Sequence, residues 1–159
     1  MLIGVMSDTH LERVTGGLQR ILESHFQKAD LILHAGDIVS GAVLSYLDGW
    51  GVSSVRGNMD RPEVSGVLPV KRVIQAGPFK IGLIHGFGAP RGLAEKLINE
   101  FDEIDCLVFG HSHQAANRVA GGVLCFNPGS AAESLTGRRR TIGLLHVTDR
   151  IEGEIVHID

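Results

Sequence analysis

The sequence is poor in several features that would place it in a special class. Aromatic residues make up 5% of its 159 residues, and it has two cysteines, Cys106 and Cys125. Both cysteines lie in apolar runs, so we expect reduced core thiols, with a disulfide as the weaker alternative. No stretch approaches the roughly 20 apolar residues of a membrane span. The first apolar run ends at Ser7, which favours a strand over a signal peptide. We therefore expect a cytoplasmic protein without membrane contact.

The chain also lacks an excess of either charge. Lys and Arg number 15 against 18 Asp and Glu, which gives a net charge of -3. Proteins that bind long nucleic acids neutralise several phosphates with basic side chains, and this balance argues against such a partner. The one basic run, Arg138 to Arg140, is typical of a solvated turn, although a ligand contact of these arginines stays open.

Glycine is abundant, at 21 residues against a typical usage of about 7%, which indicates many tight turns or close backbone approaches. Hydrophobic periodicity in the first half predicts strands at 2–6, 31–33 and 52–55, with helices at 17–26 and 43–47 between them. This alternation is typical of a parallel sheet built from strand-helix-strand units.

The second half has a different pattern. Residues 70–75 and 79–84 read as a hairpin joined at Gly77-Pro78, followed by a helix at 92–101 and a strand at 106–109. Four further short strands, at 117–119, 123–126, 141–147 and 153–158, alternate with turns as in an antiparallel sheet. We expect one domain over residues 1–159, with two sheets and helices outside them.

Polar residues follow the predicted strands at the point where each strand ends. Because the carboxyl ends of parallel strands emerge along one edge, these residues should form one site. A single metal ion would leave several of these groups buried without a partner, at a cost of roughly 1 to 3 kcal/mol each, so the set suits two divalent ions better. The residues are two aspartates, one asparagine and four histidines: Asp8, His10, Asp37, Asn58, His85, His111 and His113.

The order of these motifs resembles that of the calcineurin-like metallophosphoesterases, and specifically their small single-domain phosphodiesterase branch. The motifs are Asp8-x-His10, Gly36-Asp37, Gly57-Asn58, His85-Gly86 and Gly110-His111-x-His113. The resemblance extends to the loop at 127–130 and so covers almost the whole chain. It implies an α/β fold, a four-layer α-β-β-α sandwich of two mixed sheets with helices on the outside.

The resemblance further implies a phosphoric diester hydrolase that cleaves small phosphodiesters. In this family pattern Asp8, His10 and His113 bind one ion, while Asn58, His85 and His111 bind the other. Asp37 bridges the two ions, and a hydroxide between them is the nucleophile. Asp37, Asn58 and His111 are the expected catalytic residues. Mn²⁺ is the expected ion, with Fe, Zn and Ni as alternatives.

Several neighbours of the ligands have two interpretations each. Arg56 and Asp60 flank Asn58 and either contact substrate or pair with each other and fix the loop. Asn127 belongs to a loop that either closes over the site or is an ordinary turn. His34 either supports the ligands or is a satisfied core histidine.

The chain departs from the larger phosphatases at Met59. Those enzymes carry a histidine directly after the asparagine ligand, commonly assigned to protonate the leaving group. A thioether cannot donate a proton, so this step cannot be transferred. The small branch also lacks this histidine, and Asp60 is the nearest other candidate for the acid.

A second hypothesis comes from Vps29, a retromer subunit of the same branch regarded chiefly as a scaffold. The chain would then be a protein-binding scaffold with a residual metal site. The enzyme is favoured because all seven expected positions hold residues able to bind metal. The sequence is compatible with a homo-oligomer.

Overall fold

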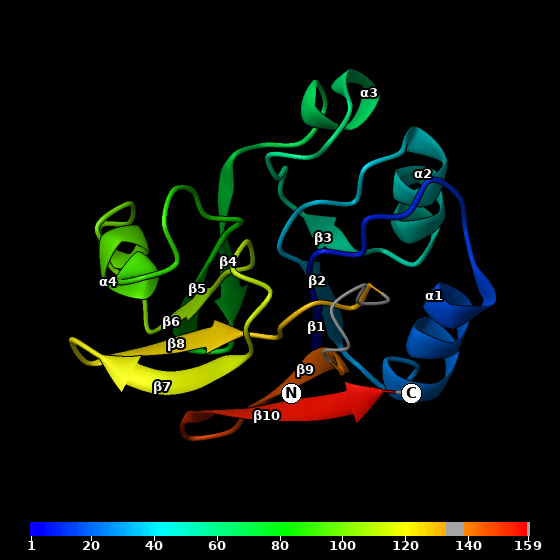
Figure 1. The fold of residues 1–159 in the computed structure, drawn as a ribbon. Helices are drawn as coiled ribbons and strands as arrows, with labels where there is room; N and C mark the ends of the chain where they lie inside the picture. The colour runs from blue at the N-terminus through cyan, green and yellow to red at the C-terminus, as the bar shows by residue number, and fades with distance from the viewer. Residues whose placement is uncertain (133–138, 159) are drawn as a thin grey trace.

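A computed structural model describes residues 1–132 and 139–158, and Figure 1 shows two sheets packed face to face with helices around them. In the first sheet the strand order is β10-β9-β1-β2-β3. The parallel part consists of β1 (Leu2–Met6), β2 (Leu31–His34) and β3 (Ser53–Ser54). The antiparallel part consists of β9 (Arg140–Val147), which pairs with β1, and β10 (Ile151–Ile158).

The second sheet has the order β4-β5-β6-β8-β7. Its hairpin is formed by β4 (Lys71–Ala76) and β5 (Phe79–Ile84). Parallel to β5 run β6 (Cys106–Val108) and then β8 (Val123–Asn127), and β7 (Ala116–Ala120) closes the edge antiparallel to β8. Both sheets are therefore mixed.

The helices are short and begin at recognisable caps. The Thr15 hydroxyl accepts a hydrogen bond from Leu18 N at the start of α1 (Gly16–Arg20), which continues into a π-helical turn, η1 (Ile21–His25). Ser40 caps α2 (Gly41–Gly49) in the same way, because a hydroxyl there satisfies an amide that the helix leaves unpaired. The remaining helices are α3 (Pro62–Ser65) and α4 (Leu93–Ile98).

Three separate apolar clusters define the layers. One lies between the first sheet and the helices α1 and α2, and includes Leu18, Leu22 and Leu47. A second, with Val5 and Phe126, lies between the two sheets. The third packs α4 against the second sheet. Three cores between four layers form the expected α-β-β-α sandwich, so the predicted fold class is confirmed.

Two details differ from the sequence-based expectation. The last four strands do not form one antiparallel sheet: β7 and β8 complete the second sheet, while β9 and β10 complete the first. The predicted helix at 17–26 is divided between α1 and η1. Both cysteines are buried and free, as predicted. Within the described residues, no helix has the length and apolarity that crossing a membrane requires.

Candidate metal centre

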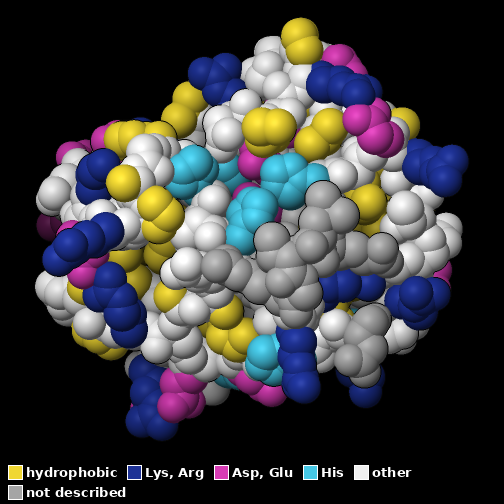
Figure 2. Space-filling model, in the orientation of Figure 1, with side chains coloured by type: hydrophobic (Ala, Val, Ile, Leu, Met, Phe, Trp, Pro, Cys, Tyr) yellow, Lys and Arg dark blue, Asp and Glu magenta, His cyan; other side chains and the backbone are white. Residues whose placement is uncertain are grey.

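The loops after five strands meet on one face of the molecule, where Figure 2 shows histidine side chains gathered around acidic groups. The loops after β1, β2 and β3 come from the first sheet, and those after β5 and β6 come from the second. The sequence predicted convergence at the edge of one open parallel sheet. That expectation is wrong in this respect, because the edges of two facing sheets supply the site.

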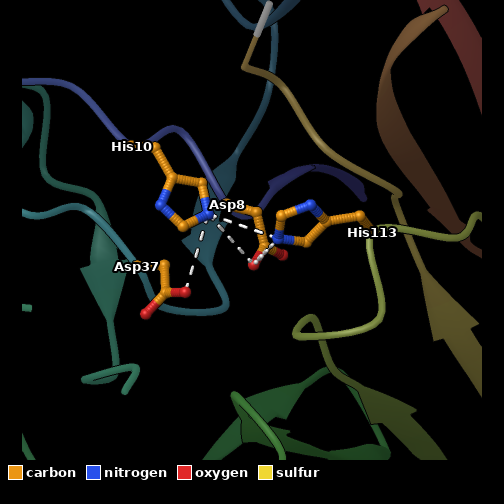
Figure 3. Close-up of side chains that lie close together, drawn as sticks. All are labelled: Asp8, His10, Asp37 and His113. Carbon is orange, nitrogen blue, oxygen red and sulfur yellow. Dashed lines mark hydrogen bonds and ion pairs between the residues drawn. The ribbon is translucent and has the colours of Figure 1, made fainter. Parts of the chain in front are cut away.

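Four of the predicted ligands form a first group: Asp8, His10, Asp37 and His113. One side-chain atom from each lies within 4.8 Å of all the others. Figure 3 shows the two imidazoles pointing toward each other above the carboxylates, with their Nε2 atoms 3.2 Å apart. His113 Nε2 lies 3.1 Å from Asp8 Oδ1, and His10 Nε2 lies 3.6 Å from Asp37 Oδ2.

The other three predicted ligands form a second group beside the first. Asn58 Oδ1 lies 3.0 Å from His85 Nε2 and 3.1 Å from His111 Nδ1. Asp37 Oδ2 lies 3.4 Å from His85 Nε2. The same carboxylate oxygen of Asp37 therefore faces both groups, and the structure brings all seven predicted residues together.

The backbone of these loops is strained where the candidate ligands lie. Positive φ angles are uncommon for residues other than glycine, and they cluster at functional sites because the surrounding structure must hold them in place. Of the six such residues described, five are candidate ligands and the sixth is Val39. The five are Asp8 (52°), His10 (48°), Asp37 (60°), His111 (68°) and His113 (55°).

Two glycines allow the loops to approach so closely. A Cβ at Gly57 would overlap the backbone and carboxylate of Asp37, and one at Gly110 would overlap Ser7 Oγ and approach Asp8 Oδ2. Gly57 and Gly110 directly precede Asn58 and His111. The absence of a side chain at each glycine therefore places the following ligand against an aspartate from another loop.

Backbone carbonyls orient the imidazoles of the second group. His85 Nδ1 donates to Ala35 O at 2.7 Å, and His111 Nε2 donates to Gly88 O at 2.9 Å. The remaining ring nitrogens, His85 Nε2 and His111 Nδ1, then turn their lone pairs toward Asn58 Oδ1. Three electron-pair donors that face one another require a proton or a cation between them, so this group fits a metal ion.

Asp8 provides a second test of the fit to a metal. Its Oδ2 accepts hydrogen bonds from Ser7 Oγ at 2.6 Å and from His111 N at 3.2 Å. Its Oδ1 is buried, and its nearest polar neighbours are the Nε2 atoms of His113 and His10, 3.1 and 3.7 Å away. With the Nε2 lone pairs of both rings facing it, this oxygen has no hydrogen-bond donor, which is costly, and a cation held jointly with His10 and His113 would stabilise it.

The electrostatics of the cluster favour ionised aspartates. Burial alone raises the pKa of Asp8, but hydrogen bonds from His10, His113 and Ser7 outweigh it and hold this pKa well below its usual range. The pKa of Asp37 is also lowered. Burial raises this pKa, but the hydrogen bond and positive charge of His85 lower it by more. Conversely, Asp8 raises the pKa of His113. Both carboxylates thus carry negative charge at neutral pH, as a cation site requires.

His34 supports the cluster from the core. The ring is fully buried, its Nδ1 accepts from Gly36 N at 3.1 Å, and its Nε2 lies 3.1 Å from Thr9 Oγ1. It therefore connects the loop that carries Asp37 to the loop that carries His10. Burial lowers the pKa of His34 to about 3, so the ring stays neutral.

The other predicted neighbours make contacts within the protein. Asp60 accepts from Val39 N and Gly57 N, both at 2.7 Å, and Arg56 Nη1 donates to Ser65 O at 3.0 Å. Each residue thus fixes a loop through backbone contacts, and the described residues show no ion pair between Arg56 and Asp60, so the expected pairing is wrong. Substrate contact by either residue stays a prediction.

Asn127 is fully buried, with its Nδ2 bonded to Gly110 O at 2.9 Å and its Oδ1 accepting from Gly129 N. It therefore holds the loop that carries His111 and does not reach the surface, which leaves no room for the predicted substrate contact in this conformation. Arg138 lies outside the described residues. Arg140 Nε donates to Ala131 O at 3.1 Å.

The supporting groups that sequence reasoning missed are mostly backbone atoms. The carbonyls of Ala35 and Gly88 select the tautomers of two histidines, and no side-chain pattern signals such a role. Ser7 carried a usable signal, since it directly precedes Asp8 at the end of a buried strand.

Comparison with known proteins agrees with this geometry. Residues 1–150 match the family model of the calcineurin-like phosphoesterase superfamily domain. The chain belongs to this superfamily. A probable metallophosphoesterase of Methanocaldococcus jannaschii is 35% identical over 163 residues, covering 100% of this chain and 82% of that protein.

The chain is also similar over nearly its whole length to a phosphodiesterase and to Vps29. A phosphodiesterase of Methanocaldococcus jannaschii is 25% identical over 169 residues, covering 98% of this chain and 99% of its own. The crystal structure of a Vps29 variant from Entamoeba histolytica is 26% identical and superposes with a TM-score of 0.74 over 100% of both chains. Both belong to the small branch that the motifs indicated.

Proposed function

We propose that this protein is a phosphodiesterase that hydrolyses small phosphodiesters with two divalent ions, Mn²⁺ being the ion to test first. One observation carries the proposal: the Asp37 carboxylate is shared between two groups of candidate ligands, each with unoccupied nitrogen and oxygen lone pairs directed inward. A single bridging carboxylate between two such groups is the arrangement of two-metal phosphoesterases.

The seven candidate ligands would bind the two ions in two groups. Asp8, His10 and His113 hold one ion, and Asn58, His85 and His111 hold the other. Ions bound there would lower the pKa of a water molecule and neutralise charge on the phosphoryl group. The carbonyls behind His85 and His111 fix the orientation of both rings, so that one nitrogen of each is directed inward.

The surroundings of the cluster support a diester over a monoester. A pocket of about 420 Å³ adjoins His10, and another of about 230 Å³ adjoins Asn58 and His85. A diester has two substituents on phosphorus, and hollows on both sides of the cluster accommodate both. The similarity to a phosphodiesterase of Methanocaldococcus jannaschii supports the same reaction.

The test combines metal analysis with hydrolysis of matched esters. Purified protein loaded with Mn²⁺ should contain two ions per chain and cleave bis(4-nitrophenyl) phosphate faster than 4-nitrophenyl phosphate. Asp37→Asn should remove most activity and at least one ion, because the amide removes the bridging charge and leaves Asp8 as the one carboxylate among the seven candidate ligands. Asp48→Asn, on the exposed side of α2, should change neither.

Two outcomes would contradict the proposal. Wild-type turnover and two ions in Asp37→Asn would show that Asp37 does not bridge. Bound metal without cleavage of any phosphoester would favour the protein-binding scaffold with a residual metal site.

A further inference from the structure

The pocket beside His10 is lined by residues of three separate segments. It lies between α1, the loop that leads from β1 to α1, and the residues on either side of the connection from β8 to β9, Ala131, Ala132 and Arg140. His10 belongs both to this lining and to the first group of candidate ligands, so the pocket is continuous with the metal centre.

Among the described residues that line the pocket, the charged side chains are two arginines. Arg20 and Arg140 contribute to the lining, and the described residues that form it include no aspartate or glutamate. Of the two acids in the loop from β1 to α1, Asp8 belongs to the candidate metal centre and Glu12 forms an ion pair with Arg61. In a protein with a net charge of -3, this concentration of guanidinium groups selects an anion.

The position of Arg140 is fixed by two features. Its Nε donates to Ala131 O at 3.1 Å, and its Nη2 would lie 3.2 Å from a Cβ at Gly17. Glycine at position 17 therefore gives the guanidinium room against α1. The lining also contains apolar Leu11, Leu18 and Ile21, which exclude water and strengthen the attraction between a guanidinium and an anion.

We propose that this pocket binds a second phosphate group, carried by the substituent of the phosphodiester that lies on the His10 side. The inference rests on the proposed function, because it places the ester phosphorus at the metal centre. Arg20 and Arg140 then act as specificity residues. They recognise a substrate such as a nucleotide ester with an additional terminal phosphate, and they take no part in bond cleavage.

Two substrates that differ only in the second phosphate test the proposal: thymidine 5′-(4-nitrophenyl phosphate) with and without a 3′-phosphate. The wild-type protein with Mn²⁺ should show a kcat/KM about tenfold higher for the 3′-phosphorylated compound. Arg20→Gln and Arg140→Gln should abolish this preference, mainly through KM, and leave the other compound within about twofold. Arg140→Lys should restore part of it. Arg13 is an exposed residue of the loop from β1 to α1 and does not line the pocket, so Arg13→Gln should leave the preference for the 3′-phosphorylated compound unchanged.

Binding to the protein kept free of metal by a chelator separates this inference from the proposed function. Thymidine 3′,5′-bisphosphate, followed by calorimetry, should bind about tenfold more weakly to Arg20→Gln and Arg140→Gln than to Arg13→Gln. Equal binding or equal substrate preference in all these proteins overturns the inference. Arginine-dependent binding in a protein that cleaves neither ester would leave the pocket assignment standing and refute the phosphodiesterase.

Discussion

Met59 determines how this site can treat a leaving group. The residue is 57% exposed beside Asn58, and its amide donates to Asp37 Oδ1 at 2.7 Å. A thioether has no proton to give, and both carboxylate oxygens of Asp60 already accept backbone amides. The structure thus offers neither residue as the general acid, and the departing oxygen leaves with little help.

We therefore expect the rate of hydrolysis to depend steeply on leaving-group acidity. Aryl phosphodiesters should be cleaved far faster than dialkyl esters, and Met59→His should narrow the gap if the imidazole reaches the oxygen. General acid catalysis is typically worth about 10² to 10⁴-fold, of which a histidine without supporting partners recovers a small part. A series of diesters of graded leaving-group pKa, assayed with both proteins, measures the slope. A flat slope with chemistry rate-limiting would require another acid.

His34 gives a prediction about acid stability. The unfolded chain binds a proton at His34 near pH 6.5, whereas burial lowers the pKa in the folded state to about 3. Stability from the neutral ring is complete above pH 6.5 and is lost as pH falls toward 3, at up to about 1.4 kcal/mol per pH unit. His34→Gln should therefore cost a few kcal/mol at pH 8 and much less at pH 4.

Urea unfolding with a chelator present measures this difference for both proteins across the pH range. Other titrating groups cancel in the comparison of wild type with His34→Gln. A cost of substitution that stays constant from pH 8 to pH 4 would mean that His34 is not held neutral.

At the residue scale, the sequence was sufficient to identify the side chains of the candidate metal centre. The seven candidate ligands were predictable because each follows a buried strand and because their order matches a family pattern. The orientation of His85 and His111 was not predictable, since it depends on carbonyls that folding brings from distant loops.

At the scale of elements, the loops before the ligands matter as much as the strands. Gly57 and Gly110 leave no space for a Cβ against Asp37 and Ser7, while Gly49 at the end of α2 has nothing within 4 Å of such an atom. The two kinds of glycine provide a matched comparison of the same substitution.

We expect Gly57→Ala to push its loop away from Asp37 and to weaken metal binding at least tenfold, with a loss of stability of about 1 to 3 kcal/mol. Gly49→Ala should leave metal binding unchanged and alter stability by less than about 1 kcal/mol. Metal titration and thermal unfolding of both variants measure these effects. Equal metal affinity and equal stability of the two variants would show that Gly57 does not lie in close contact with Asp37.

The elements themselves were predictable to different degrees. Strong apolar runs predicted β1, β2, β5 and β6 almost to the residue, and Gly77-Pro78 marked the hairpin of β4 and β5. The allocation of β9 to the first sheet and β8 to the second could not be read from periodicity, because alternation shows which face is buried and not which strand lies alongside. The short helix α3 has too few residues for a periodic signal.

For the whole molecule, the candidate centre is a junction between the two sheets. Asp8, His10, Asp37 and Asn58 follow strands of the first sheet, whereas His85, His111 and His113 follow strands of the second. The apolar cluster between the sheets packs them face to face. An ion shared by ligands from both sides adds a cross-link at the rim, so metal binding and the stability of the sandwich should be coupled.

This coupling should depend on pH with a definite sign. Burial lowers the pKa of His85, but Asp37 and Asp8 raise it more, and Asp8 likewise raises that of His113, so protons compete with metal already above pH 6.5. In the metal-free protein these protonated rings contribute stability below pH 6.5 that is lost as pH rises through their raised pKa values. Metal replaces the protons at higher pH.

Excess Mn²⁺, at about 100 times its Kd, should therefore raise Tm by about 5 to 10 °C at pH 8. The increase should shrink as pH drops below 7 and vanish near pH 5, because each ion must then displace protons from imidazoles. Thermal unfolding with and without a chelator at each pH measures it, with Asp37→Asn as the variant that should gain little at any pH. An increase of the same size at pH 5 would mean that carboxylates alone hold the ion, and that the four histidines on this face do not.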